Sequence, residues 1–111
     1  MTNTYLEAIA TAGKALITHI ALHDSIGVQV GDGRKAVTWG ANNGNGDFFM
    51  STDLIFDMSA GQEVAGWSGW SAATGGTRYG GADLSPRSFV NPGTYTLLAN
   101  HTGIKHNAWN A

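Results

Sequence analysis

The sequence predicts a mainly β protein, a β-sandwich or jelly-roll-like domain that carries one N-terminal α-helix. Short apolar segments with a period of two recur along the chain, and turn signals separate them about every 8 to 12 residues. The 16 glycines outnumber the 2 prolines, as expected where many tight turns and bulges join short strands. A length of 111 residues is typical of one domain, so we expect residues 1–111 to fold as a single unit.

The helix is predicted over residues 4–16. Thr4 and Glu7 match a capping box, in which the threonine hydroxyl accepts an amide proton at the start of the helix and the glutamate reaches back. Apolar and small residues then recur at helical spacing and form one narrow stripe, namely Leu6, Ile9, Ala10, Gly13 and Leu16. We treat this stripe, with Leu6, Ile9, Gly13 and Leu16 as its members, as a candidate interface with the chain's own sheet or with a neighbouring molecule.

After the helix the hydrophobic period changes to two, which predicts strands. The expected strands are 17–23, 36–39, 48–58 with a break near Asp53, 64–72, 77–82 and 94–100. The expected turns and loops are 31–33, 41–47, 59–62, 85–86 and 91–93, each rich in Gly, Pro, Asn, Asp or Ser. The segment 102–111 shows no clear period.

The segment 67–81, WSGWSAATGGTRYGG, predicts a hairpin whose turn is Ala73-Thr74-Gly75-Gly76. Adjacent glycines supply the positive φ angles that a tight hairpin turn requires, so Gly75 and Gly76 are expected to have positive φ. Trp67 and Trp70 are an odd number of residues apart, which places them on opposite faces of a strand. One of them can therefore enter a core while the other faces a partner.

The composition excludes several functions. Charged residues make up only 13% of the chain, the formal net charge is −2, and Arg34-Lys35 is the densest basic cluster, so we expect no nucleic-acid binding. The absence of cysteine excludes disulfides and thiolate metal sites. No apolar run is long enough to span a membrane, and the N-terminal residues do not resemble a secretory signal. A surface so poor in charge is typical of one that neighbouring subunits cover.

No motif predicts catalysis or a metal. His19 and His23 fall on a predicted strand, where residues four apart lie about 13 Å from each other and cannot share an ion. The loop Asn42–Asp47 offers oxygen ligands for calcium but only one carboxylate, which favours an Asx-rich turn. We find no nucleophile elbow and no phosphate-binding loop. We therefore predict no catalytic residue, no metal site, no cofactor and no enzymatic activity.

Aromatic side chains are the remaining candidates for a site. Flat rings can stack on sugars, and they also dominate protein cores and interfaces. The low charge favours core and interface positions over a sugar platform. The candidate interface or glycan contacts are Trp67, Trp70, Tyr79 and Trp109, and Trp39 belongs to the same set of aromatics that can line a sugar platform, a core or an interface.

Most of the chain, from about residue 19 to residue 98, resembles a family of small virion proteins of tailed phages that infect actinobacteria. The segments that carry the resemblance are HIALH at 19–23, AVTWGA at 36–41, FDMSAG at 56–61 and SAATGGT at 71–77. Family members typically have a TADPG sequence after the second histidine, where this chain has Asp24-Ser25-Ile26-Gly27, and a proline where it has Ser59.

The resemblance implies a fold and a virion context but no active site. The expected function is that of a non-enzymatic virion structural protein, a minor tail or tail-tip component assembled in many copies after synthesis in the host cytoplasm. A capsid decoration protein and a glycan-binding module that contacts the host surface are the alternatives. The expected partners are other tail or capsid proteins, further copies of the chain and, in the last case, a host glycan, with no nucleic acid and no membrane.

Overall fold

The computed structural model describes residues 3–42, 47–99 and 102–104. The first element is the helix α1 (Asn3–Leu16), which begins one residue before the predicted start. Thr4 therefore lies inside the helix, and the predicted capping box with Glu7 is wrong in its register. No helix within the described segments is long and apolar enough to cross a membrane.

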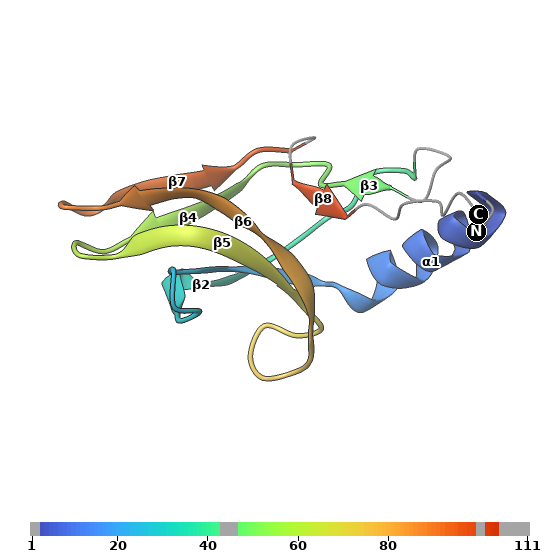
Figure 1. Cartoon of the computed structure of the whole chain (residues 1–111), viewed down its shortest axis with the longest axis horizontal. Coiled ribbons are helices and arrows are strands. Elements are labelled where there is room, and N and C mark those ends of the chain that lie inside the picture. Colours follow the sequence, from blue (N-terminus) through green and yellow to red (C-terminus); the bar gives the residue numbers. More distant parts are fainter. Residues whose placement is uncertain (1–2, 43–46, 100–101, 105–111) are drawn as a thin grey trace.

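Eight strands follow the helix in the described part of the chain, and the pairings among them are antiparallel. They are β1 (His19–His23), β2 (Gln29–Ala36), β3 (Phe48–Phe49), β4 (Leu54–Met58), β5 (Glu63–Trp70), β6 (Arg78–Ser88), β7 (Gly93–Leu97) and β8 (Gly103–Ile104). The longest sheet has the order β2-β1-β5-β6, and the pairs β4-β7 and β3-β8 form two smaller sheets (Figure 1).

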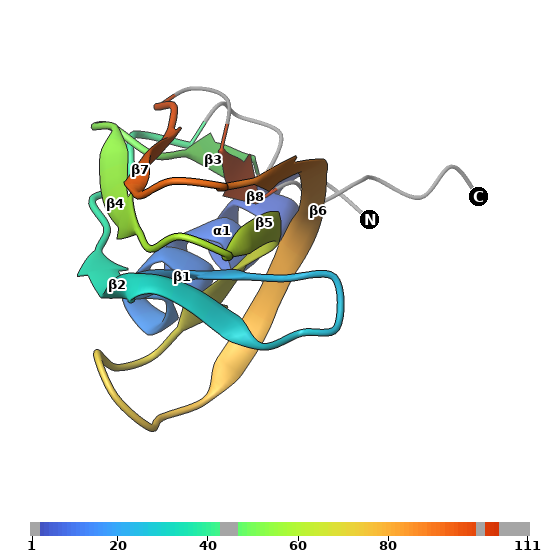
Figure 2. The ribbon, with the colours of Figure 1, turned by 90° about the vertical axis from the view of Figure 1, so that its left-hand side faces the viewer.

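The sheets lie in layers around one main core. Viewed along the long axis of the molecule, the β4-β7 pair covers the four-stranded sheet, and β2 and β4 lie together on one side (Figure 2). The side chains between the layers come from both sheets and from the connecting segments, namely Ile17, Ile20, Leu22, Val30, Met50, Leu54, Phe56, Met58, Val64, Trp67, Phe89 and Leu97. This arrangement confirms the predicted class, a β-sandwich-like domain with one N-terminal helix.

The strand boundaries differ from prediction where backbone irregularities interrupt the hydrophobic pattern. The expected strand 36–39 is absent as such, because β2 ends at Ala36 and Trp39 forms only an isolated bridge with Met50. The expected turn at 31–33 lies inside β2, where Gly31 and Gly33 both have positive φ. Glycine admits this conformation without ending the strand, so the glycines mark an irregular strand here instead of a turn.

Two further predicted boundaries, those of the strand 48–58 and of the loop 85–86, can be compared with the observed strands. The predicted strand 48–58 is divided into β3 and β4 by residues 50–53, consistent with the expected break near Asp53. Ser85-Pro86 does not form a loop, because β6 continues to Ser88. Proline has no amide proton to donate, and it is tolerated here because β6 is the edge strand of its sheet and its register with β5 shifts between Val64 and Gly66.

Candidate interaction surface

Helix α1 carries two apolar seams instead of the single predicted stripe. The inner seam consists of Leu6, Ala10, Gly13 and Ile17, the last of which follows the helix directly. The outer seam consists of Tyr5, Ile9, Ala12 and Leu16. In both seams the steps are four, three and four residues. The predicted stripe joined members of the two seams, because residues three and four apart are both neighbours on a helix.

The inner seam packs against the chain's own residues. Leu6 is only 1% exposed and Ala10 is fully buried. Gly13 lies over the ring of Phe48, since a Cβ atom at Gly13 would lie 3.5 Å from the Cζ atom of Phe48. Phe48, which is itself fully buried, thus holds the helix to the short β3-β8 sheet.

Trp39 supports the same junction from the loop after β2. Its ring meets the ring of Phe48 edge to face, with 4.9 Å between the ring centres. Its indole N–H donates a 2.8 Å hydrogen bond to the carbonyl of Ile17 at the end of the helix. The aromatic pair and this hydrogen bond fix the direction in which α1 leaves the sheet.

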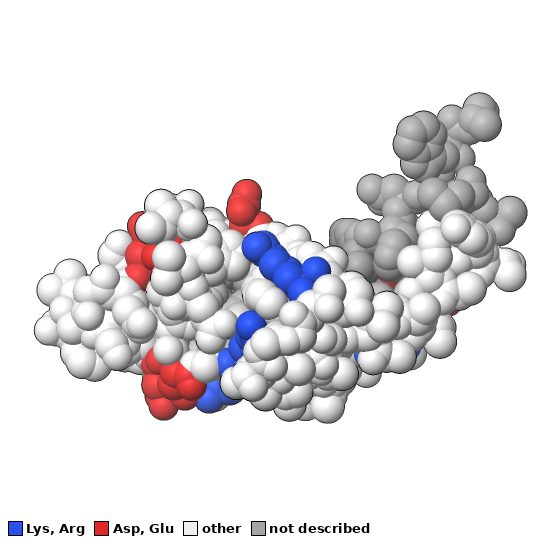
Figure 3. Space-filling view, turned by 90° about the horizontal axis from the view of Figure 1, so that it is seen from below, with Lys and Arg blue, Asp and Glu red and all other residues white. Residues whose placement is uncertain are grey.

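The outer seam faces away from the core. Tyr5 and Leu16 are large side chains with mostly apolar surfaces, yet they are 55% and 46% exposed. Lys14 lies on another side of the helix and donates a hydrogen bond to the carbonyl of Gly40. On the face shown in Figure 3, the Lys, Arg, Asp and Glu side chains gather over the sheet half, and the helix half is almost entirely uncharged.

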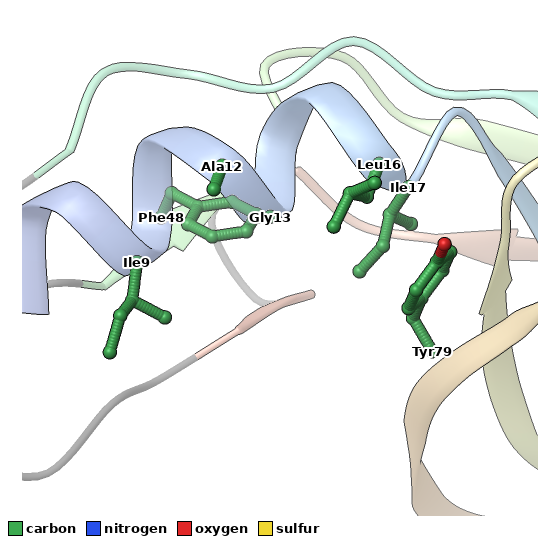
Figure 4. A pocket seen from close by; sticks show the side chains of 7 residues that line it. All are labelled: Ile9, Ala12, Gly13, Leu16, Ile17, Phe48 and Tyr79. Carbon is green, nitrogen blue, oxygen red and sulfur yellow. The ribbon is translucent and has the colours of Figure 1, made fainter.

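An apolar groove of about 290 Å³ runs along the outer seam, between α1 and β6. Ile9 stands at one end, Leu16, Ile17 and Tyr79 at the other, and Phe48 lies behind Gly13 at the back (Figure 4). The described residues that line this groove include no charged side chain; they are Ile9, Ala12, Gly13, Leu16, Ile17, Phe48 and Tyr79. The groove can therefore accept an apolar side chain, and the Tyr79 hydroxyl is the one polar side-chain group among its described lining residues.

The structure brings only part of the predicted sites together. Ile9, Gly13, Leu16 and Tyr79 meet in the groove, although they were predicted as two separate sets. Leu6 belongs to the inner seam and is buried. Trp109 lies outside the described residues.

Trp67 is not a surface contact, because its side chain is 3% exposed and belongs to the main core. Trp70 lies at the end of β5 and is half-buried. The guanidinium carbon of Arg34 lies 3.7 Å from the centre of its ring, so one ring face is covered by a cation. Trp67 therefore provides no ring platform for stacking on a sugar, and one face of the Trp70 ring is already occupied.

Arg34 is a residue that the sequence analysis missed. Besides stacking on Trp70, its Nη1 atom donates to the carbonyl oxygens of Ala72 and Gly75, at 3.0 and 2.6 Å. It thus fastens the 71–77 loop to β2. Gly75 and Gly76 in this loop have φ angles of 63° and 73°, which confirms the predicted positive φ at both.

A second, more polar groove of about 500 Å³ separates β6 from β7. Each of these strands pairs with a described strand on one side only, so two sheet edges flank this groove. Its lining combines hydroxyl groups, a cation, an aromatic ring and apolar side chains, namely Ser85, Pro86, Arg87, Thr94, Tyr95, Thr96 and Leu98.

The histidines that invited a metal interpretation lie at the two ends of β1. His19 Nδ1 pairs with the hydroxyl of Thr18, and His23 Nδ1 pairs with the carbonyl of Asp24. Within the described part of the chain, no group of three or more His, Asp or Glu residues is arranged to hold a metal ion. Residues 43–46 of the oxygen-rich loop lie outside the described residues, while the Asn42 amide donates to the hydroxyl of Thr11 on α1.

One carboxyl group has a perturbed pKa. The hydrogen bond from the Lys35 ammonium group lowers the pKa of Asp32 below its usual value, and the amide of Asp57 contributes in the same direction. Since Asp32 is on β2 and Asp57 on β4, this carboxylate joins the two layers. Asp32 lines neither of the two grooves.

Comparisons of the chain with protein-family models, curated proteins and solved structures give no match.

Proposed function

We propose that the chain is a non-enzymatic structural protein of a phage virion, a minor tail or tail-tip component that is assembled in many copies. The observation that carries this proposal is the uncharged groove along α1, together with the large exposed side chains beside it. An apolar surface of this kind is typical of a protein that works while covered by a partner. The resemblance to small virion proteins of tailed phages supplies the virion context.

The arrangement of the helix supports an assembly role in a second way. Isolated helices of about 12–15 residues are marginally stable in water, so they depend on packing. The inner seam supplies part of this packing, and the outer seam offers the rest to a partner. In this proposal the folded sheets hold α1 in position before assembly, and contact with a partner then stabilises the helix further.

Labelling of purified virions tests the proposal and its location. An antibody against this chain, seen by electron microscopy on virions of the phage that encodes it, is expected to mark the tail. Label spread over the head would instead support the alternative of a capsid decoration protein. Virions that lack the chain and retain all their other proteins and full infectivity would contradict both structural roles.

Glycan binding at the host surface is a second candidate, and the polar groove between β6 and β7 favours it. Ser85, Thr94 and Thr96 provide hydroxyl groups that donate and accept hydrogen bonds, and Tyr95 provides an aromatic ring. Binding of the isolated chain to host cell-wall glycans, reduced by Thr96→Ala and retained by Ala12→Ser on the other groove, would support this function. The absence of binding to any host glycan would remove it.

A further inference from the structure

We propose that the outer seam of α1 pairs with the outer seam of α1 in a second copy of this chain, and that the two helices run antiparallel. This inference deepens the proposed assembly role, because it names a second copy of the chain as one of the partners, and to that extent it rests on the proposed function. The pairing itself is a property of the isolated chain and requires no virion.

The spacing of the outer seam fits a helix as the partner. Tyr5, Ile9, Ala12 and Leu16 are separated by steps of four, three and four residues. This is the spacing of the a and d positions in a helix–helix seam, with Ile9 and Leu16 at a and Tyr5 and Ala12 at d.

The seam is complementary to itself in the antiparallel direction. If a two-fold axis passes between Ala10 and Thr11, Tyr5 faces Leu16 of the second copy and Ile9 faces Ala12 of the second copy. A large side chain then lies opposite a small one in the central layers. A parallel pair would instead set Ala12 against Ala12 and leave a void there.

The groove provides the hole into which Ile9 of the second copy would fit. Ala12 and Gly13 are small, and the ring of Phe48 closes the back of the groove behind them (Figure 4). Tyr5 of the second copy would reach the end of the groove that Leu16 and Tyr79 form. Because the two-fold axis repeats each contact, both grooves are filled at once.

The electrostatics of the seam suit an apolar partner. Ile9, Ala12 and Leu16 carry no charge, and no charged side chain lines the groove among the described residues. Lys14 is engaged with the carbonyl of Gly40 on another side of the helix. An approaching apolar helix therefore removes few polar groups from water at the centre of the contact.

Light scattering after size-exclusion chromatography, over a wide range of chain concentrations, tests the pairing. The wild-type chain is expected to form dimers. Ala12→Glu places a carboxylate at the centre of the seam and should raise the dimer dissociation constant at least about 100-fold. Thr4→Glu adds the same charge at an exposed position of the same helix outside the seam and should leave dimerisation unchanged.

A rescue experiment tests the antiparallel register. Ile9→Ala removes the large member of the central layer, and Ala12→Ile overfills the small one, so each single variant should dimerise more weakly. The double variant Ile9→Ala/Ala12→Ile exchanges the two members and should recover the wild-type dissociation constant. Failure of this rescue, with circular dichroism and melting temperature showing a folded chain, would overturn the antiparallel register.

The self-pairing and the virion role fail separately. A wild-type chain that stays monomeric at all concentrations overturns the self-pairing, even if labelling places the chain in virions. A dimer that Ala12→Glu does not weaken also overturns it, because the contact must then lie elsewhere. A dimer that behaves as expected but is missing from virions leaves the pairing intact and overturns the proposed function.

Discussion

The two adjacent glycines of the 71–77 loop differ in what surrounds them, although both have positive φ. A Cβ at Gly75 would meet nothing within 4 Å, whereas a Cβ at Gly76 would lie 2.6 Å from the Oγ atom of Ser71. Gly75→Val should therefore lower the free energy of unfolding by about 1–3 kcal/mol through backbone strain. Gly76→Val should lower it further, because the clash adds to the same strain.

Urea unfolding of the two variants beside the wild-type chain measures this difference. Equal losses would show that the loop moves freely enough to relieve the clash at Gly76. Unchanged stability in both variants would contradict the assigned turn.

Residues become predictable from sequence when their role is local. The positive φ of Gly75 and Gly76 follows from a turn between two aromatic segments, and the sequence alone indicates it. Arg34 lies 38 residues before Ala72, and nothing in its own neighbourhood points to the loop that it holds. The alternation that separates Trp67 from Trp70 predicts opposite faces, but only the packing of the two sheets decides which of them enters the core.

The two tryptophans of β5 should differ strongly in their contribution to stability. Trp67→Ala removes a buried ring from the main core and should lower the free energy of unfolding by about 3–5 kcal/mol. Trp70→Ala removes a half-buried ring that contacts Arg34 and donates a hydrogen bond to the Ser68 hydroxyl, and a cation–π contact at such a site is worth about 0.5–1 kcal/mol. Guanidinium chloride unfolding monitored by circular dichroism compares the two. A larger loss for Trp70→Ala would contradict the placement of Trp67 in the core.

At the scale of elements, Asp32 joins β2 to β4. Its carboxylate accepts hydrogen bonds from the Lys35 ammonium group at 2.7 Å and from the Asp57 amide at 3.2 Å. Asp32→Asn retains an oxygen for the amide but loses the charge that attracts Lys35. Because the ion pair is partly exposed, the variant should be less stable near pH 7 by only about 0.2–1 kcal/mol.

The pH dependence of this difference follows from the lowered pKa of Asp32. A carboxyl whose pKa is lower in the folded chain than the usual 3.8 stabilises the fold above that value. This stabilisation is lost as the pH falls through the folded-state pKa. The gap between wild type and Asp32→Asn, measured by urea unfolding at several pH values, should therefore close in acid. A gap that persists well below pH 3.8 would show that charge is not its cause.

Element boundaries were predictable where the hydrophobic period is regular. β4 and the end of α1 fall near their expected positions because their buried residues recur at a constant step. β1 also ends where expected, although its three central residues are all buried. β2 was not predictable, since Gly31 and Gly33 indicate a turn, whereas in the structure they lie inside β2, between Val30 and Lys35, where its pairing with β1 is irregular. The two seams of α1 have the same spacing, so only the position of Phe48 decides which of them is covered.

At the scale of the whole molecule, the described residues form two apolar regions of unequal size. The main core joins both sheet layers and includes no residue of α1 itself. The smaller region lies between α1 and β3. It contains the buried side chains of Leu6 and Ala10, and Gly13 packs over the ring of Phe48. Since the helix contributes only to the smaller region, it is expected to open without unfolding the sheets.

Native-state hydrogen exchange should resolve these two regions. In Ala12→Glu, which we expect to be monomeric, the amides of α1 should exchange faster than those of the central strands β1 and β5, because opening the helix leaves the main core intact. In the wild-type chain the protection of α1 should rise with concentration as a second helix covers Tyr5, Ile9 and Leu16, while that of β1 and β5 stays nearly constant. Helix amides that are as protected as those of β5 in the monomer would show that α1 and the sheets unfold as one unit. The sheet-bound helix would then need no partner for its stability, and the exposed seam would have to be explained by some other contact.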